Sequence, residues 1–308
     1  MGKNEKKNCE AALSRISNLH SLFYTPDCYD EIYAQNQYDA QRATCHRPSK
    51  YPQVKGFLTL FTQLFKEFSY SPDAVVGRVK RERRFLPEEM VCTTTLYAYI
   101  NAQLLEIRNI DLLDKLKRKT VTRRIRKNKK VLGESIEKRP PEVLSRESFG
   151  HFEIDTVIGK RDGSETALLT LTERKTRFEL IRLLDRKDAD SVSYALKQLI
   201  AEFGPTKFDQ LFQSITSDSG SEFALLTETM KKFCPVYFTH PYTSCERGTN
   251  ENHNRMIRRT LPKSQSLDMC SRKDIQRIED QMNHLPRKVL NYATPQESFD
   301  QEVLLAVS

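Results

Sequence analysis

The stretch His151-Phe152-Glu153-Ile154-Asp155-Thr156-Val157-Ile158 decides the fold of this 308-residue chain. It is a strand-like run, and two further strand candidates follow it at residues 166–172 and 177–184. Short turns join the three, through Lys160-Arg161-Asp162-Gly163 and Glu173-Arg174-Lys175. We therefore predict a meander of three antiparallel strands.

The sequence after this meander alternates between helix and strand patterns. A helix is predicted over 188–203, because its apolar residues fall on one face, and Gly204-Pro205 ends it. A strand at 213–217, a helix at 221–232 and a strand at 235–239 come next. Three antiparallel strands followed by alternating helices and strands predict an α/β domain with a mixed sheet flanked by helices. A ribonuclease-H-like architecture matches this order.

An all-α region is predicted before the sheet, with three helices between residues 55 and 105. Ser71-Pro72-Asp73 gives the second helix an N-cap and a proline in its first turn. The third helix follows Cys92-Thr93-Thr94-Thr95, which offers a threonine N-cap. The pattern is typical of a helix-turn-helix DNA reader, and an ordinary three-helix bundle is the alternative.

Positive charge is concentrated in the first half of the chain. Residues 1–150 carry 28 lysines and arginines against 18 acids, whereas residues 151–308 carry 22 against 23. Ten of these cations, and no acid, lie between residues 115 and 130. The block predicts a solvated linker that can also bind nucleic-acid phosphates. Within it we expect Arg123, Arg124, Arg126 and Lys127 to contact DNA.

Other classes of protein are disfavoured by composition. No apolar stretch reaches the length of a membrane span, and no apolar signal core follows Met1. The seven cysteines form no CxxC pair, which argues against a disulfide framework or a zinc ribbon. We expect a cytoplasmic protein with free thiols.

Three acids stand where a site for two divalent cations would need them. Asp155 lies within a predicted strand, Asp218 ends another, and Glu251 begins a helix-like stretch. Mg²⁺ and Mn²⁺ prefer oxygen ligands, and two such ions about 3.5–4 Å apart can catalyse phosphoryl transfer. Glu153 and Glu222 are competing candidates. Glu153 shares a strand face with Asp155, and Glu222 suits the first turn of a helix.

The stretch from Gly150 to Phe299 resembles transposases of insertion-sequence family thirty, whose core is related to retroviral integrases. Several motifs carry the resemblance in the same order as in the family. They are Gly150-His151-Phe152-Glu153-Ile154-Asp155, Glu173-Arg174-Lys175-Thr176-Arg177-Phe178, Ser217-Asp218-Ser219-Gly220-Ser221-Glu222-Phe223-Ala224 and His240-Pro241-Tyr242-Thr243-Ser244-Cys245-Glu246-Arg247-Gly248-Thr249-Asn250-Glu251-Asn252.

The resemblance implies that Asp155, Asp218 and Glu251 form a DDE triad binding two Mg²⁺ or Mn²⁺ ions. It implies metal-dependent DNA cleavage and strand transfer at element ends, on double-stranded DNA, by a homodimer or larger assembly near the bacterial nucleoid. Cys245 replaces a usual tryptophan and Arg255 a usual glycine, and both can lower activity. The first 30 residues do not match the additional helix-turn-helix with which the family usually begins, which leaves truncation or divergence open.

Four residues near Glu251 are further candidates for contacts with DNA. Arg247 and Asn250 precede Glu251 in the sequence, Asn250 directly. Arg258 and Arg259 follow it along the same predicted helix. A solvated helix face is the alternative for the two later arginines. The alternative function is a catalytically impaired DNA-binding remnant, such as a repressor of its own element. A nuclease that only cuts is a third hypothesis.

These patterns together predict four segments. Residues 1–50 form a poorly assigned helical region, and residues 51–112 a DNA-binding domain of helix-turn-helix type. Residues 113–146 form the basic linker, for which Pro140-Pro141 marks a boundary. Residues 147–304 form the integrase-type catalytic core.

Overall fold

The computed structural model describes residues 30–44, 50–112, 132–159, 166–240, 248–263 and 265–307. The chain divides into two compact units, Met1–Pro52 and Gln53–Ser308. The first contains helix α2 (Glu31–Thr44), where Asp30 Oδ1 accepts hydrogen bonds from the amides of Ile32 and Tyr33. No helix among the described residues is long and apolar enough to cross a membrane.

The second unit begins with the predicted all-α region. Its helices are α3 (Lys55–Phe68), α4 (Pro72–Glu82) and α5 (Thr93–Asn101). Ser71 caps α4 by accepting a hydrogen bond from the Ala74 amide at 3.2 Å. The expected threonine cap on α5 is wrong, because Cys92 occupies the N-cap position and its side chain makes no capping hydrogen bond.

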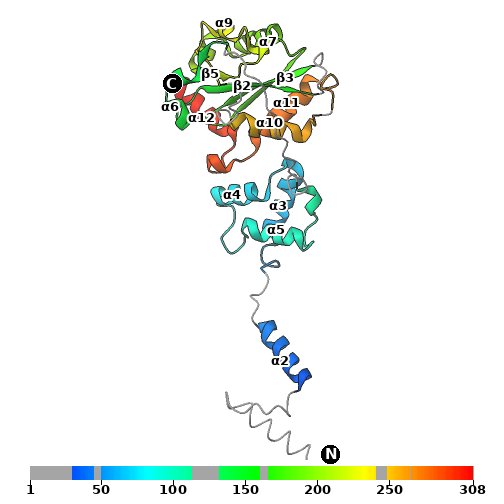
Figure 1. The fold of residues 1–308 in the computed structure, drawn as a ribbon. Coiled ribbons are helices and arrows are strands. Elements are labelled where there is room, and N and C mark those ends of the chain that lie inside the picture. Colours follow the sequence, from blue (N-terminus) through cyan, green and yellow to red (C-terminus); the bar gives the residue numbers. More distant parts are fainter. Residues whose placement is uncertain are drawn as a thin grey trace, which may run out of the picture. The chain divides into compact units, whose positions relative to one another are not determined.

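A six-stranded mixed sheet forms the centre of the unit (Figure 1). The strands are β1 (Glu134–Ser135), β2 (His151–Ile158), β3 (Ala167–Glu173), β4 (Glu179–Leu184), β5 (Ser214–Ser217) and β6 (Val236–Phe238). Their order is β1-β6-β5-β2-β3-β4. The β2-β3-β4 meander is antiparallel, whereas β5 pairs in parallel with β2 and β6. This is the ribonuclease-H-like arrangement that the sequence predicts.

Helices cover both faces of the sheet (Figure 1). Those on one face are α7 (Ala189–Phe203), α8 (Pro205–Leu211), α9 (Leu226–Met230) and α12 (Pro295–Val307), and those on the other are α10 (Gly248–Thr260) and α11 (Arg272–His284). Phe152 and Ile154 pack with the first group, and Val157 packs with the second. Since side chains alternate along a strand, Asp155 belongs to the face that α10 covers.

Several elements differ from the prediction. The expected helix at 221–232 is a 3₁₀ turn, η4 (Ser221–Phe223), followed by the short α9, because the Glu222 side chain turns inward and is buried. Helix α8 was not predicted; Gly204 has φ +81° and ends α7, and Pro205 then starts α8. Strand β1 also lies in the segment predicted as linker.

The remaining short elements are η2 (Asn109–Asp111), η3 (Ile136–Lys138), α6 (Glu142–Ser145) and η6 (Lys288–Leu290).

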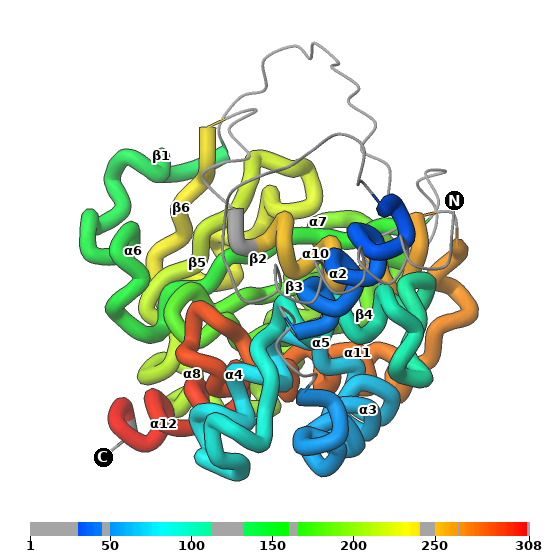
Figure 2. The backbone as a smooth tube through the Cα atoms, turned by 90° about the horizontal axis from the view of Figure 1, so that it is seen from below, coloured from blue at the N-terminus to red at the C-terminus, as the bar shows by residue number. Residues whose placement is uncertain are grey.

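Helix α4 packs against the chain that leads into α12 (Figure 2). A Cβ atom at Gly77 would lie 2.2 Å from the ring of Tyr292, so this contact requires glycine. At the next position, the Arg78 guanidinium donates to both oxygens of Glu297, at 2.6 and 2.8 Å. Tyr292 Oη donates to Asp73 at 3.2 Å. These contacts attach the helical region to the sheet domain.

The pair between Arg78 and Glu297 predicts a pH-dependent stability. The hydrogen bond from Arg78 lowers the pKa of Glu297 to about 2, from an ordinary value of 4.5. The pair therefore stabilises the fold fully above pH 4.5, and this contribution is lost as the pH falls towards 2. Glu297→Gln should cost about 1 kcal/mol at pH 7, because 39% of the Glu297 side chain remains exposed. Urea unfolding at several pH values measures this.

Asp300→Asn on the same helix is the matched control, since it removes a charge without touching Arg78. The difference in unfolding free energy between the wild type and Glu297→Gln should shrink as the pH falls below 4.5. A difference that stays constant from pH 7 to pH 3 would contradict this role for the pair.

Candidate active site

Asp155 is fixed by hydrogen bonds from two elements. On β2 its Oδ1 accepts from the Thr156 amide at 2.9 Å, and its Oδ2 accepts from Asn254 Nδ2, on α10, at 2.8 Å. Its carbonyl oxygen accepts from Thr170 Oγ1, on β3, at 3.2 Å. The carboxylate is half-buried and its direction is set by a central strand and a helix.

Asp218 follows directly after β5 and is also half-buried. Its Oδ1 accepts a hydrogen bond from the Gly220 amide at 3.1 Å. The parallel register pairs Glu153 with Thr216, and each of these two residues lies two positions before one of the aspartates. The carboxyl ends of neighbouring parallel strands are a common place for ligand-binding groups in α/β proteins.

Glu251 lies in the first turn of α10 and its side chain is exposed. Asn254, three residues later, lies on a neighbouring part of the same helix surface and reaches Asp155. The helix that carries Glu251 therefore contacts Asp155 through Asn254. Even so, the part of the chain that the structure describes contains no group of three or more His, Cys, Asp or Glu residues placed to hold a metal ion.

The atoms around Asp155 and Asp218 are nevertheless of the kind that binds a hard cation such as Mg²⁺. Asn254 Oδ1 and Ser219 Oγ are buried oxygens for which the described residues supply no hydrogen-bond partner. Asn254 is hydrogen-bonded to Asp155, and Ser219 directly follows Asp218 in the sequence. Carboxylate, amide and hydroxyl oxygens suit Mg²⁺. Asp155 and Asp218 are therefore the residues best placed to hold a divalent cation.

Glu222 lies in the first turn of the 3₁₀ helix η4, as the sequence indicates, and its side chain also makes contacts elsewhere in the fold. It is buried, it accepts a hydrogen bond from Thr156 Oγ1 at 3.0 Å, and it forms an ion pair with Lys187 at 2.9 Å. Burial raises the pKa of Glu222, but the hydrogen bonds from Lys187, its own amide and Thr156 outweigh burial and leave the pKa lowered. A Cβ atom at Gly220 would lie 2.5 Å from this carboxylate. Glu222 therefore connects the Asp218 loop to β2, and no local sequence signal reveals this.

Glu153 is not exposed. It is fully buried and forms an ion pair with Arg174, which is 3% exposed. Nearby, Glu179 accepts hydrogen bonds from Thr172 Oγ1 and from His253 Nδ1, both buried. The β2 face beneath α10 thus carries a layer of buried polar pairs beside Asp155.

The residues predicted to contact DNA differ in where the structure places them. Arg123, Arg124, Arg126, Lys127 and Arg247 lie outside the described residues. Arg258 donates to the carbonyl oxygens of Ile158 and Leu261, which ties α10 to the end of β2. Asn250 is buried, and neither of its amide atoms has a hydrogen-bond partner among the described residues. Arg259 lines a pocket on another side of α10. Contact of these residues with DNA stays a prediction.

The proteins that resemble this chain in sequence include three transposases from different bacteria. The "Probable transposase for insertion-like sequence element IS1161" of Streptococcus salivarius is 39% identical over 68% of this chain and 58% of its own length. The transposase for insertion sequence element IS4351 of Bacteroides fragilis is 34% identical over 89% of this chain and 81% of its own. Transposase InsI for element IS30C of Escherichia coli K12 is 29% identical over 78% of this chain and 63% of its own.

The chain therefore spans less than two thirds of the first and third of these relatives. No model of a known protein family matches it. Among solved structures, the catalytic core domain of BIV integrase is similar, with a TM-score of 0.39 and 13% identity, over 52% of this chain and all of that one. A likeness of that size carries no argument about the site.

Proposed function

The chain belongs to the transposases of insertion-sequence family thirty (IS30), and we propose that it cuts DNA at element ends and joins the freed ends to target DNA. The observation that carries the proposal is the geometry around Asp155. Asp155 lies on β2, which pairs in parallel with β5, and Asp218 directly follows β5; the Asp155 carboxylate also accepts a hydrogen bond from the helix that bears Glu251. Membership of the family supports a DNA-processing enzyme, and this geometry supports the residues that act.

We propose that Asp155, Asp218 and Glu251 bind two divalent ions, Mg²⁺ or Mn²⁺. Such ions activate an attacking oxygen and stabilise a leaving oxygen in phosphoryl transfer. The contribution of the chain is to hold the ligands in one direction before DNA arrives. Asn254 and the Thr156 amide fix both oxygens of Asp155, and the Gly220 amide fixes one oxygen of Asp218.

The reaction has two in-line displacements and requires no covalent protein–DNA intermediate. Water attacks a phosphodiester at the element end and leaves a free 3′-hydroxyl, which then attacks a phosphodiester of the target. The two ends of an element must be held together, so the proposal includes at least a homodimer on double-stranded DNA. Since the proposed substrate is chromosomal DNA, we also propose that the protein acts at the bacterial nucleoid.

The test is cleavage and strand transfer on DNA that contains the sequences flanking the gene. With Mg²⁺ or Mn²⁺, the full chain should produce new 3′-hydroxyl ends and then joined products, separable on a denaturing gel. Chelation of the metal with EDTA should abolish both products while leaving DNA binding intact. Cleavage that continues in EDTA would contradict the metal-dependent mechanism.

A catalytically impaired DNA-binding remnant is the second candidate, because Cys245 and Arg255 stand where the family usually has tryptophan and glycine. The same experiment separates the candidates. A remnant binds the flanking DNA and gives no cleavage with either metal, whereas a nuclease that only cuts gives cleavage without joined products.

A further inference from the structure

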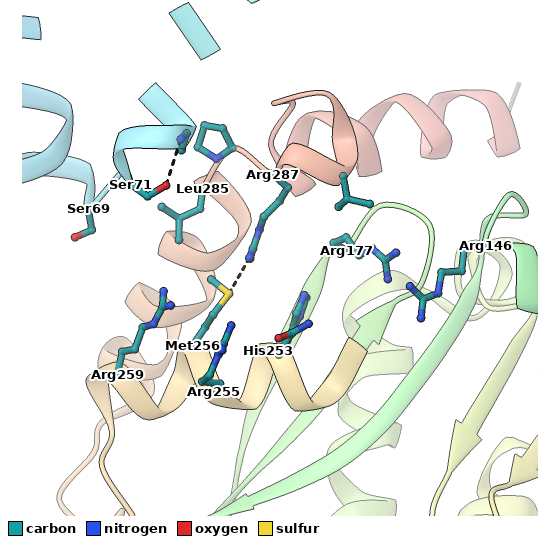
Figure 3. A pocket seen from close by; sticks show the side chains of 14 residues that line it. Ser69, Ser71, Arg146, Arg177, His253, Arg255, Met256, Arg259, Leu285 and Arg287 are labelled. Atoms are coloured by element: carbon teal, nitrogen blue, oxygen red, sulfur yellow. Dashed lines mark hydrogen bonds between the residues drawn. The ribbon is translucent and has the colours of Figure 1, made fainter. Parts of the chain in front are cut away.

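A pocket of about 590 Å³ lies where the helical region meets the sheet domain (Figure 3). Ser69, Ser71 and Ala74 line it from the α3–α4 turn and the start of α4. Helix α10 and the segment Leu285–Arg287 after α11 line it from the other domain. A volume of this size is in the range of pockets that hold a ligand group larger than a single ion.

The lining is strongly cationic. Five arginines contribute to it, and none of the described residues that line it is acidic. They come from four separate segments of the chain: Arg146 after α6, Arg177 in the β3–β4 turn, Arg255 and Arg259 on α10, and Arg287 after α11. In Figure 3, Arg146 and Arg177 lie close together, and Arg287 points towards Met256.

Gathering these cations is unfavourable without an anion. Burial, and then the charge of Arg146, lower the pKa of Arg177 to about 10. The pKa of Arg287 is lowered to about 10, mainly by burial. The nearby charge of Glu179 raises this pKa, whereas the charges of Arg259 and Arg177 lower it. Arg146 and Arg177 also adopt left-handed backbone conformations, with φ of 61° and 62°, which arginine disfavours. Strain of this kind is often retained where a residue has a function.

Arg287 has weak partners for a buried cation. Its Nη1 donates to the thioether sulfur of Met256 at 2.7 Å, and its Nη2 donates to the Met282 carbonyl at 3.1 Å. Its Nε is buried and has no hydrogen-bond partner among the described residues. A thioether is a weak acceptor, so the guanidinium keeps donors for a ligand.

The N-terminus of α4 adds to the positive potential. Ser71, its N-cap, and Ala74, in its first turn, both line the pocket. The amide groups at the start of a helix carry partial positive charge and favour anions. Arginine in turn matches phosphate oxygens through pairs of parallel hydrogen bonds.

We propose that this pocket binds backbone phosphates of DNA, so that the α3–α4 turn and the sheet domain grip the same DNA segment. The inference rests on the proposed function, because it takes DNA as the ligand. DNA is favoured over a small free anion because the pocket lies at the junction with a helix-turn-helix region and holds more positive charge than a single phosphate balances. Asn254 and the pocket arginines Arg255 and Arg259 lie on different sides of α10, so the pocket is separate from Asp155.

The test compares two double variants of the full chain with equal loss of charge. Arg146→Gln/Arg255→Gln removes two pocket arginines, and Arg272→Gln/Arg277→Gln removes two exposed arginines from α11, outside the pocket. DNA affinity is measured in EDTA over a range of salt concentrations. Each lost phosphate contact lowers the slope of log K against log salt by about 0.9, so the pocket variant should lose about 2 in slope. The α11 variant should keep the wild-type slope.

Several results would overturn the proposal. They are an unchanged slope in the pocket variant with wild-type melting temperature, an equal loss of slope in the α11 variant, and no binding of DNA by the wild type. A further result is that inorganic phosphate saturates the pocket of the wild type while the pocket variant binds DNA as the wild type does. This result would also overturn the proposal, because the ligand of the pocket would then be a free anion. Cleavage with Mg²⁺ is assayed in parallel. A change in slope without any cleavage rejects the proposed function alone, and cleavage with an unchanged slope rejects the pocket proposal alone.

Discussion

Asp155→Asn is expected to lower the rate of DNA cleavage by at least about 10³-fold while DNA binding persists. The substitution keeps the size of the side chain but removes a negative charge from the proposed cation site. Loss of several kcal/mol of transition-state stabilisation by the metal site corresponds to a factor of this size. The measurement is the single-turnover rate of 3′-end formation at saturating protein, with Mg²⁺.

Two further variants make this result specific. Glu228→Gln removes an exposed acid on α9 and should keep the wild-type rate. Asn254→Ala removes the hydrogen bond to Asp155 but no charge, so it should lose about 10–100-fold and require more Mg²⁺ for half-maximal activity. Wild-type cleavage by Asp155→Asn would show that the site is assigned to the wrong residues. An unchanged Mg²⁺ requirement in Asn254→Ala would remove Asn254 from the positioning of Asp155.

Arg174→Met is expected to lower the free energy of unfolding by about 3–5 kcal/mol. Glu153 is fully buried and pairs with Arg174, so the substitution leaves its carboxylate buried without a cation. Methionine fills much of the space of the arginine side chain, which keeps a cavity from dominating the result. Urea denaturation at pH 7 measures the change, with Arg186→Met, an exposed arginine, as the control.

The double variant Glu153→Gln/Arg174→Met separates charge from packing. Removing both charges should recover a large part of the loss, because a buried pair is costly to break and much less costly to replace. A cost below 1 kcal/mol in Arg174→Met alone would contradict the stabilising role of the pair. An equal cost in the single and the double variant would assign the loss to packing.

The sequence predicts the central part of the fold well, since strand and helix signals there are local. The β2 run has the predicted bounds, and Asp188 caps α7 where the prediction starts that helix. Strand β1 has two residues, and its pairing with β6 joins segments about a hundred residues apart, so no local pattern marks it. Long-range pairing of this kind is decided by tertiary contacts.

Of the candidate site, the sequence predicts only the acidic residues. Asp155 and Asp218 stand out because the first lies within a strand pattern and the second directly follows one, each in a recognisable motif. The partners that orient the site were not predictable, since Asn254 reaches Asp155 across 99 positions and Glu222 reaches Thr156 across 66. The arginine pocket combines residues from Ser69 to Val289, and only the folded chain brings them together.

Helix α10 contacts Asp155 on one side through Asn254 and the arginine pocket on another through Arg255 and Arg259. A helix that borders two proposed binding sites can couple them only if it has two positions that the ligands bind differently. If DNA in the pocket shifts α10 and thereby changes the affinity of the aspartates for metal, then metal must change the affinity for DNA by the same factor. Such reciprocity would let the enzyme keep its cation site weak until DNA is held, which protects DNA from cleavage away from an element end.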